Sequence, residues 1–174
     1  MKKLLPLVLA AACGAVFAQN AQNANGQLDK KDREFIEKAA AGGMMEVEVG
    51  RLAESKAQNA DVKAFGSTLV KDHSAANDEL KSIAQKKGVQ VPSALPKKEQ
   101  KELDKLSKSK DFDKDFIKHV GVSDHKKDIK DFQKEAKNGK DPDVKGFASK
   151  TLPTLQSHLQ TAEGLEKSAK GKKS

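Results

Sequence analysis

Three of the four histidines in the sequence fall on the apolar side of a helical repeat. They are His73 in LVKDHSAAN, His125 in SDHKKDIKDF and His158 in LPTLQSHL. Side chains advance by about 100° per residue along a helix, and at this step each ring shares a stripe with apolar neighbours. His119 falls about 120° from His125 and is expected at the surface or rim. Three inward imidazoles are a candidate metal site, because neutral imidazole is a common metal ligand.

A carboxylate extends this pattern to a fourth helical stretch. Glu46 lies about 20° from Phe35 within the apolar stripe of its helix, whereas Glu48 points to the other side. Glu46 and His73 also lie at a similar depth, each about 20 Å from the turn that joins their helices. Each predicted helix therefore contributes one inward ionisable group. The predicted ligand set for a metal ion is Glu46, His73, His125 and His158.

Two aspartates, Asp72 and Asp124, directly precede two of these histidines. Residues that are adjacent on a helix do not face each other, so neither aspartate is expected to hold its own histidine. We expect them instead to orient a group on a neighbouring helix or to lie at the solvent edge.

The donor set suits zinc, iron, manganese or copper, whereas magnesium and calcium prefer oxygen ligands. The same residues could instead form a metal-free network of hydrogen bonds, since a buried carboxylate requires a partner. An enzyme, for instance one that acts on superoxide or peroxide, would also need an open coordination position and access for solvent. No Ser-His-Asp or Cys-His arrangement, phosphate-binding loop or redox cysteine pair can be assembled.

A di-iron centre of the ferritin type does not fit the sequence. That centre uses a Glu-x-x-His motif on each of two helices. The residues three positions before the inward histidines are Val70, Val122 and Leu155. A site here would therefore use a different ligand set, whatever the fold.

The elements that carry these residues are predicted to be four helices, because strand patterns are nearly absent. Short polar turns follow the first and third helices, so each pair should form an antiparallel hairpin. The openings DVKAF and DVKGF show that the two hairpins resemble each other. Asp61 and Asp141 are expected to cap their helices, and Pro142 suits a first helical position. The predicted helices cover about residues 30–58, 61–87, 111–138 and 141–168.

The segment between the hairpins contains two prolines in GVQVPSALP and then a short helical stretch, KKEQKELDKLSKS. Nine extended residues can span about 30 Å, the length of a twenty-residue helix. A long crossover of the ferritin type is therefore possible. The sequence predicts an all-α fold, a ferritin-like antiparallel four-helix bundle built from two helical hairpins.

The first eighteen residues, MKKLLPLVLAAACGAVFA, are typical of a secretory signal peptide cleaved near Ala18. Cleavage would remove Cys13, the one cysteine, and leave a chain without disulfides or thiolate ligands. The residues before Cys13 do not form a lipoprotein box, so lipid anchoring is not favoured. The mature protein is expected in the periplasm or outside the cell, with no transmembrane segment and with an envelope protein as a possible partner.

The composition argues against a further class of function, nucleic-acid binding. The net charge is +8, but the lysines alternate with acidic residues, as on a solvated helix face. Tyr and Trp are absent, so bases would have few stacking partners and no nucleic-acid binding is expected. We expect a signal peptide over 1–18, a disordered linker over 19–29, one domain over 30–168 and a basic disordered tail over 169–174.

Two long segments resemble a family of secreted bacterial proteins known as domain of unknown function 4142. They are GGMMEVEVGRLAESKAQNADVKAFGSTLVKDHSAANDEL and GKDPDVKGFASKTLPTLQSHL, and the likeness extends over about residues 32–167. The resemblance implies a ferritin-like fold and export, but it implies no activity. VGVSDH, around Asp124 and His125, is a less regular match.

Overall fold

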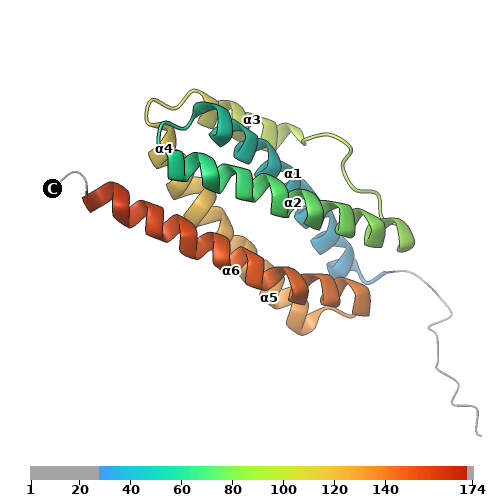
Figure 1. Cartoon of the computed structure of the whole chain (residues 1–174). Coiled ribbons are helices and arrows are strands. Elements are labelled where there is room, and N and C mark those ends of the chain that lie inside the picture. Colours follow the sequence, from blue (N-terminus) through green and yellow to red (C-terminus); the bar gives the residue numbers. More distant parts are fainter. Residues whose placement is uncertain (1–27, 172–174) are drawn as a thin grey trace, which may run out of the picture.

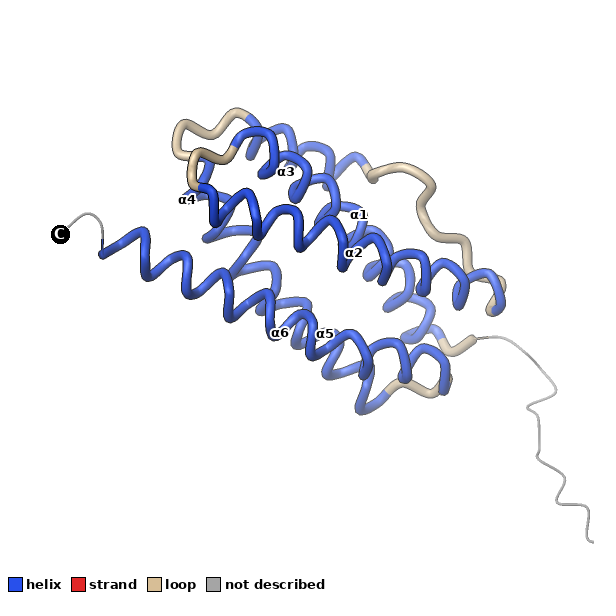
Figure 2. The backbone as a smooth tube through the Cα atoms, in the orientation of Figure 1, coloured by secondary structure: helices blue, strands red, loops and turns tan. Residues whose placement is uncertain are grey.

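The computed structural model describes residues 28–171, which are almost entirely helical and contain no strand in that range (Figures 1 and 2). The all-α expectation is confirmed. The predicted signal peptide, most of the linker and the last three residues lie outside the described range. None of the helices in residues 28–171 is long and apolar enough to cross a membrane. The elements are α1 (Lys30–Lys56), α2 (Ala60–Lys86), α3 (Lys97–Ser107), α4 (Phe112–Asp115), η1 (Phe116–Asp124), α5 (His125–Asn138) and α6 (Pro142–Gly171).

Helices α1 and α2 form the first hairpin, and their ends follow capping rules. The carboxylate of Asp29 accepts the N–H of Lys31 at the start of α1. Asn59 caps α2 by accepting the N–H of Asp61 at 2.7 Å, so the cap lies two residues before the expected Asp61. The amide oxygen of an asparagine at the N-cap accepts a hydrogen bond from the free N–H groups of the first helical turn as well as a carboxylate does.

The connection between the hairpins returns along the length of the molecule (Figure 1). After α2 ends, an extended segment leads to α3, which packs against α1 and reaches the end of the bundle where α4 begins (Figure 2). Pro96 precedes the first residue of α3 and has extended backbone, as expected for a residue that cannot donate a backbone hydrogen bond. This path places α2 and α5 in the same direction.

The predicted single helix over 111–138 is wrong in its middle. Residues 112–115 form α4, residues 116–124 wind as the π-helix η1, and α5 begins at His125. A π-helix has wider turns than an α-helix, so side chains advance by a smaller angle per residue. This explains why the apolar stripe of the segment drifts when it is counted at 100° per residue.

Helix α6 begins as predicted, with Asp141 accepting the N–H groups of Asp143 and Val144 and with Pro142 in the first position. The helix continues through Pro153 and reaches Gly171, three residues beyond the predicted end. Residues 169–171, expected in the tail, are therefore helical.

The core consists of two apolar clusters, one toward each end of the bundle. One contains Phe35, Leu80, Phe132, Phe147 and Leu155, and the other contains Phe65, Leu69, Phe116, Val120 and Ala162. His73 lies in the sequence between Leu69 and Leu80, and His158 lies between Leu155 and Ala162. The helices therefore carry the inward histidines to the junction of the two clusters.

Candidate metal centre

His73, His125 and His158 come together in the interior. Each offers one ring nitrogen, and these atoms all lie within 4.8 Å of one another. The side chains are 7%, 0% and 2% exposed, and the ring centroids are 5.2–5.8 Å apart. We call these residues the histidine triad. The rings come from α2, from the first residue of α5 and from α6, so segments far apart in the chain assemble the cluster.

The outer nitrogen of His125 is held by the main chain. Its Nδ1 lies 3.0 Å from the carbonyl oxygen of Val120, five residues earlier within η1. A carbonyl oxygen only accepts, so His125 must donate from Nδ1. Burial is the main cause that lowers the pKa of His125 to about 4, so the ring is neutral at physiological pH. The lone pair of neutral His125 is therefore on Nε2.

The outer nitrogen of His158 is held by a carboxylate. Its Nε2 lies 3.0 Å from Oδ2 of Asp72 on α2. A carboxylate accepts, so His158 donates from Nε2, and in the neutral ring the lone pair is on Nδ1. Asp72 thus contacts a histidine on another helix and not His73, its neighbour in sequence. Such a carboxylate contact fixes the orientation of a histidine ring in many metal sites.

The two inner nitrogens point toward each other. His125 Nε2 and His158 Nδ1 are 3.2 Å apart. If neither ring carries a second proton, the two outer donors make both inner nitrogens acceptors, and a shared cation would satisfy both of them. Two nitrogens bound to one tetrahedral ion at about 2.0–2.1 Å would be separated by about 3.3 Å. The observed separation fits shared ligation of one ion.

His73 completes the triad with an unsatisfied nitrogen. Its Nε2 is buried and has no hydrogen-bond partner among residues 28–171. Burial is the largest cause that lowers the pKa of His73 to about 3, so this ring is also neutral. A buried polar ring nitrogen without a partner costs free energy, and such groups are rare in folded proteins. Metal ligation would satisfy it.

Glu46 is buried, as its position in the stripe predicts, but it is not a member of the group of mutually close ligand atoms. Burial, and then the negative charges of Asp128 and Asp124, raise the pKa of Glu46 well above its usual value. Both causes favour the neutral form of the carboxyl group. The neutral form costs less to bury than the charged form, and Oε2 has no hydrogen-bond partner among residues 28–171.

Asp124 and His119, the remaining positions considered from the sequence, differ in burial. Asp124 is half-buried at the end of η1 and makes no hydrogen bond to a histidine within the part of the chain that the structure describes. Burial raises its pKa. His119 is exposed, as expected.

Two groups near the triad were not predicted from the sequence: the main-chain carbonyl of Val120 and the side chain of Asp128. Val120 acts through its main chain, which leaves no signal in a side-chain pattern. Asp128 lies three residues after His125, a spacing that places both on one side of a helix, and burial raises the pKa of Asp128 to about 6. The i,i+3 spacing could have revealed Asp128.

The fold and this cluster define a class: an all-helical bundle protein with three buried histidines that converge between its two hairpins. Residues 17–165 match the family described as domain of unknown function (DUF4142), and the chain belongs to this family, as its motifs predicted. No curated protein matches the chain, and no solved structure does.

Proposed function

We propose that this protein is an exported envelope protein that binds one metal ion through the histidine triad. The observation that carries the proposal is the 3.2 Å approach of His125 Nε2 and His158 Nδ1, whose outer partners leave both as acceptors. His73, whose buried Nε2 has no partner among residues 28–171, offers a third ring nitrogen within the same group. Zinc, copper and iron suit imidazole ligands best, and manganese is a fourth candidate.

The ferritin-like four-helix bundle is part of this proposal. The two antiparallel hairpins and the long connection along α1 support it, since one long crossover is typical of ferritin-like connectivity. Export is supported by the signal-peptide pattern over residues 1–18, with its lysines, apolar stretch and small residue at Ala18. A role in envelope metal handling or stress is consistent with these features.

A metal-free interaction bundle is the second candidate, and the contact between His158 and Asp72 favours it. If His158 carried two protons, it could pair with Asp72 and also donate to His125. This arrangement would satisfy two of the three rings. It would leave His73 Nε2 buried without a partner, which is why we favour metal binding.

The test is the metal content of mature protein purified without a tag or chelator from the periplasm. We expect about one ion per chain in the unmodified protein and loss of that ion in a His73→Ala, His158→Ala double variant. His119→Ala is the matched control, because this histidine is exposed and should not change the metal content. Unmodified protein that is folded, metal-free and resistant to loading would support the interaction bundle instead.

A further inference from the structure

The start of α1 is held against the turn between α5 and α6 by one buried carboxylate. Asp32 lies in the first turn of α1 and is 1% exposed. Its Oδ2 accepts the main-chain N–H of Lys140 at 3.0 Å and that of Asp141 at 2.7 Å. This contact joins the beginning of the first hairpin to the turn of the second, so it closes one end of the bundle.

A second carboxyl group lies under the same turn. Glu135, near the end of α5, is 7% exposed, and its Oε1 has no hydrogen-bond partner among residues 28–171. Gly139 packs directly on it, since a Cβ atom at Gly139 would lie 2.3 Å from Oε1. The main-chain N–H of Gly139 is already used, because it donates to the carbonyl oxygen of Glu135 at 2.8 Å. The carboxyl group is therefore enclosed without a donor from Gly139.

The two carboxyl groups contact each other. The side chain of Glu135 hydrogen-bonds to Asp32. Two ionised carboxylates can only accept, so this bond requires a proton on one of them. Asp32 already accepts two main-chain N–H groups, so Glu135 is the donor. Loss of this proton would remove the hydrogen bond and place a second negative charge beside Asp32.

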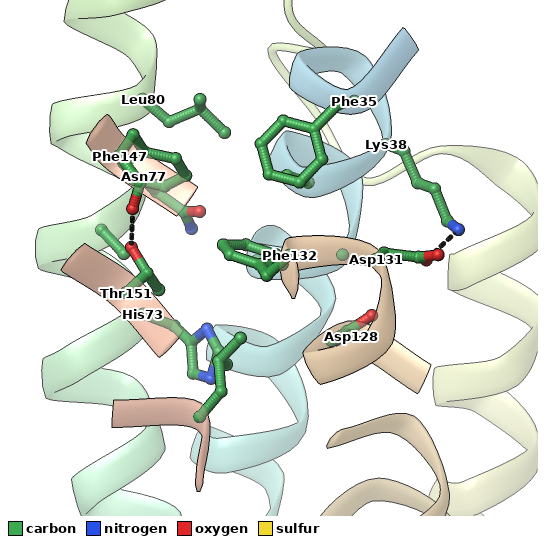
Figure 3. Close-up of a pocket in the computed structure, with 15 residues that line it drawn as sticks. Phe35, Lys38, His73, Asn77, Leu80, Asp128, Asp131, Phe132, Phe147 and Thr151 are labelled. Atoms are coloured by element: carbon green, nitrogen blue, oxygen red, sulfur yellow. Dashed lines mark hydrogen bonds and ion pairs between the residues drawn. The ribbon is translucent and has the colours of Figure 1, made fainter. Parts of the chain in front are cut away.

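Charged side chains from four helices surround the pair, but most of the lysines are paired with other acidic groups. Lys140 pairs with Asp29, Lys87 of α2 pairs with Asp141 and Asp143, and Lys38 pairs with Asp131, as Figure 3 shows for the last of these. The other charged side chains beside the pair are Lys31, Glu34, Lys134 and, on α6, Lys145. Lys145 lowers the pKa of Glu135, but its effect is smaller than that of burial or of Asp32.

The pair lies beside an opening to solvent. A hollow of about 540 Å³ has Asp32, Glu135 and Gly139 in its wall. Burial, followed by the negative charge of Asp32, raises the pKa of Glu135 from 4.5 to about 7. Water reaches the edge of the pair, so Glu135 can lose its proton without unfolding of the bundle.

We propose that Asp32 and Glu135 form a pH-sensitive clasp, which keeps the start of α1 on the α5–α6 turn while Glu135 is protonated and weakens when Glu135 ionises. The clasp is separate from the histidine triad and does not depend on metal binding. Glu135 has a pKa of about 7 in the closed clasp, against 4.5 as its ordinary value. The contribution of the proton to closure is therefore complete below about pH 4.5 and is lost as the pH rises through about 7.

Hydrogen exchange, measured by NMR in metal-free buffer, tests the clasp directly, because the N–H groups of Lys140 and Asp141 donate to Asp32. Protection is the ratio of the intrinsic to the observed exchange rate, which removes the ordinary effect of pH. From about pH 5 to about pH 7, protection at these two groups should fall roughly 30-fold. The N–H of Ala57, which donates to Ala53 at the other end of the bundle, should change less than about threefold.

Two variants and a control identify the group responsible. Glu135→Gln keeps a hydrogen-bond donor but cannot ionise, so protection at the turn should not depend on pH. Asp32→Asn should move the fall to lower pH, because the charge of Asp32 is the second cause of the raised pKa of Glu135. Glu37→Gln, at an exposed position on α1, should behave like the unmodified protein.

The carboxyl carbon resonance of Glu135 provides a second measurement and should titrate near pH 7 in the unmodified protein. A midpoint below about pH 5 would overturn the clasp. Equal falls in protection at Ala57 and at the turn would also overturn it, because the bundle would then open only as a whole. The same conclusion would follow if Glu135→Gln kept the pH dependence of the unmodified protein.

Discussion

The outer contacts of two histidines decide the chemistry of the triad. The Val120 carbonyl and the Asp72 carboxylate each receive an N–H from a ring, so the other nitrogens of His125 and His158 turn toward each other. Burial keeps His125 and His73 neutral, which is the form of imidazole that binds metal ions. The site thus depends as much on the groups behind the rings as on the rings themselves.

Asp72→Asn should weaken metal binding without unfolding the protein. The amide keeps the shape of the carboxylate but removes the charge that orients His158, so affinity should fall about 10-fold to 100-fold. Competition titration with a chromophoric chelator measures this affinity. Asp78→Asn, at an exposed position on the same helix, is the control. Equal affinities in the two variants would show that Asp72 does not orient the ligand.

The helices fix the triad through their close approach and through one irregular segment. Gly50 of α1 and Gly66 of α2 face each other so closely that a Cβ atom at either would lie 2.7 Å from the carbonyl oxygen of the other. In the other half of the bundle, η1 replaces regular α-helix just before His125 and includes the Val120 carbonyl that holds its ring. The π-helical winding therefore belongs to the construction of the site.

Gly50→Ala should destabilise the fold although alanine favours helices. The added methyl group meets backbone atoms that cannot rotate away, so α1 and α2 must separate, at a cost of about 1–3 kcal/mol. Gly146→Ala is the control, because its Cβ atom meets nothing within 4 Å and should stabilise α6 by up to about 1 kcal/mol. Urea unfolding measures both changes. A neutral or stabilising Gly50→Ala would show that the two helices are free to move apart.

Across the whole molecule, buried ionisable groups change the free energy of unfolding with pH in opposite directions. Glu135 is 7% exposed, and burial followed by the negative charge of Asp32 raises the pKa of Glu135 from 4.5 to about 7. Between these values the folded state binds more protons than the unfolded state, so the free energy of unfolding falls as pH rises. The folded state lowers the pKa of His73 to about 3 and that of His125 to about 4, from the ordinary value of 6.5. Between about pH 4 and 6.5 the unfolded state therefore binds more protons at these two rings, and their contribution to the free energy of unfolding rises with pH.

Glu135→Gln should isolate the first of these contributions. Glutamine resembles the protonated acid at every pH, so the stability of the variant relative to the unmodified protein should increase from pH 5 to pH 8 by about 1–3 kcal/mol. Denaturant unfolding across this range, in metal-free buffer, provides the measurement. Glu37→Gln, at an exposed position on α1, should show no such trend. Parallel pH profiles for Glu135→Gln and the unmodified protein would contradict the prediction.

The sequence by itself determined the all-helical fold, the approximate helices and the three histidines that face inward. These properties follow from local periodicity and capping, which depend on residues within a few positions of one another. The match of its motifs to the family also came from contiguous segments. The apolar stripe before His125 drifts when it is counted at 100° per residue, as a π-helical segment would cause. The sequence pattern nevertheless predicted one regular helix there.

Only the tertiary structure decided which inward groups meet. Glu46 and the histidines share similar stripes, yet the close group contains His73, His125 and His158 and excludes Glu46. The π-helical segment shifts the phase of the third helical stretch, and the approach of neighbouring helices sets distances that no single periodicity contains. The same is true of Asp72, which contacts His158 because α2 lies beside α6. Contacts between distant segments depend on how whole helices pack, so a one-dimensional pattern cannot specify them.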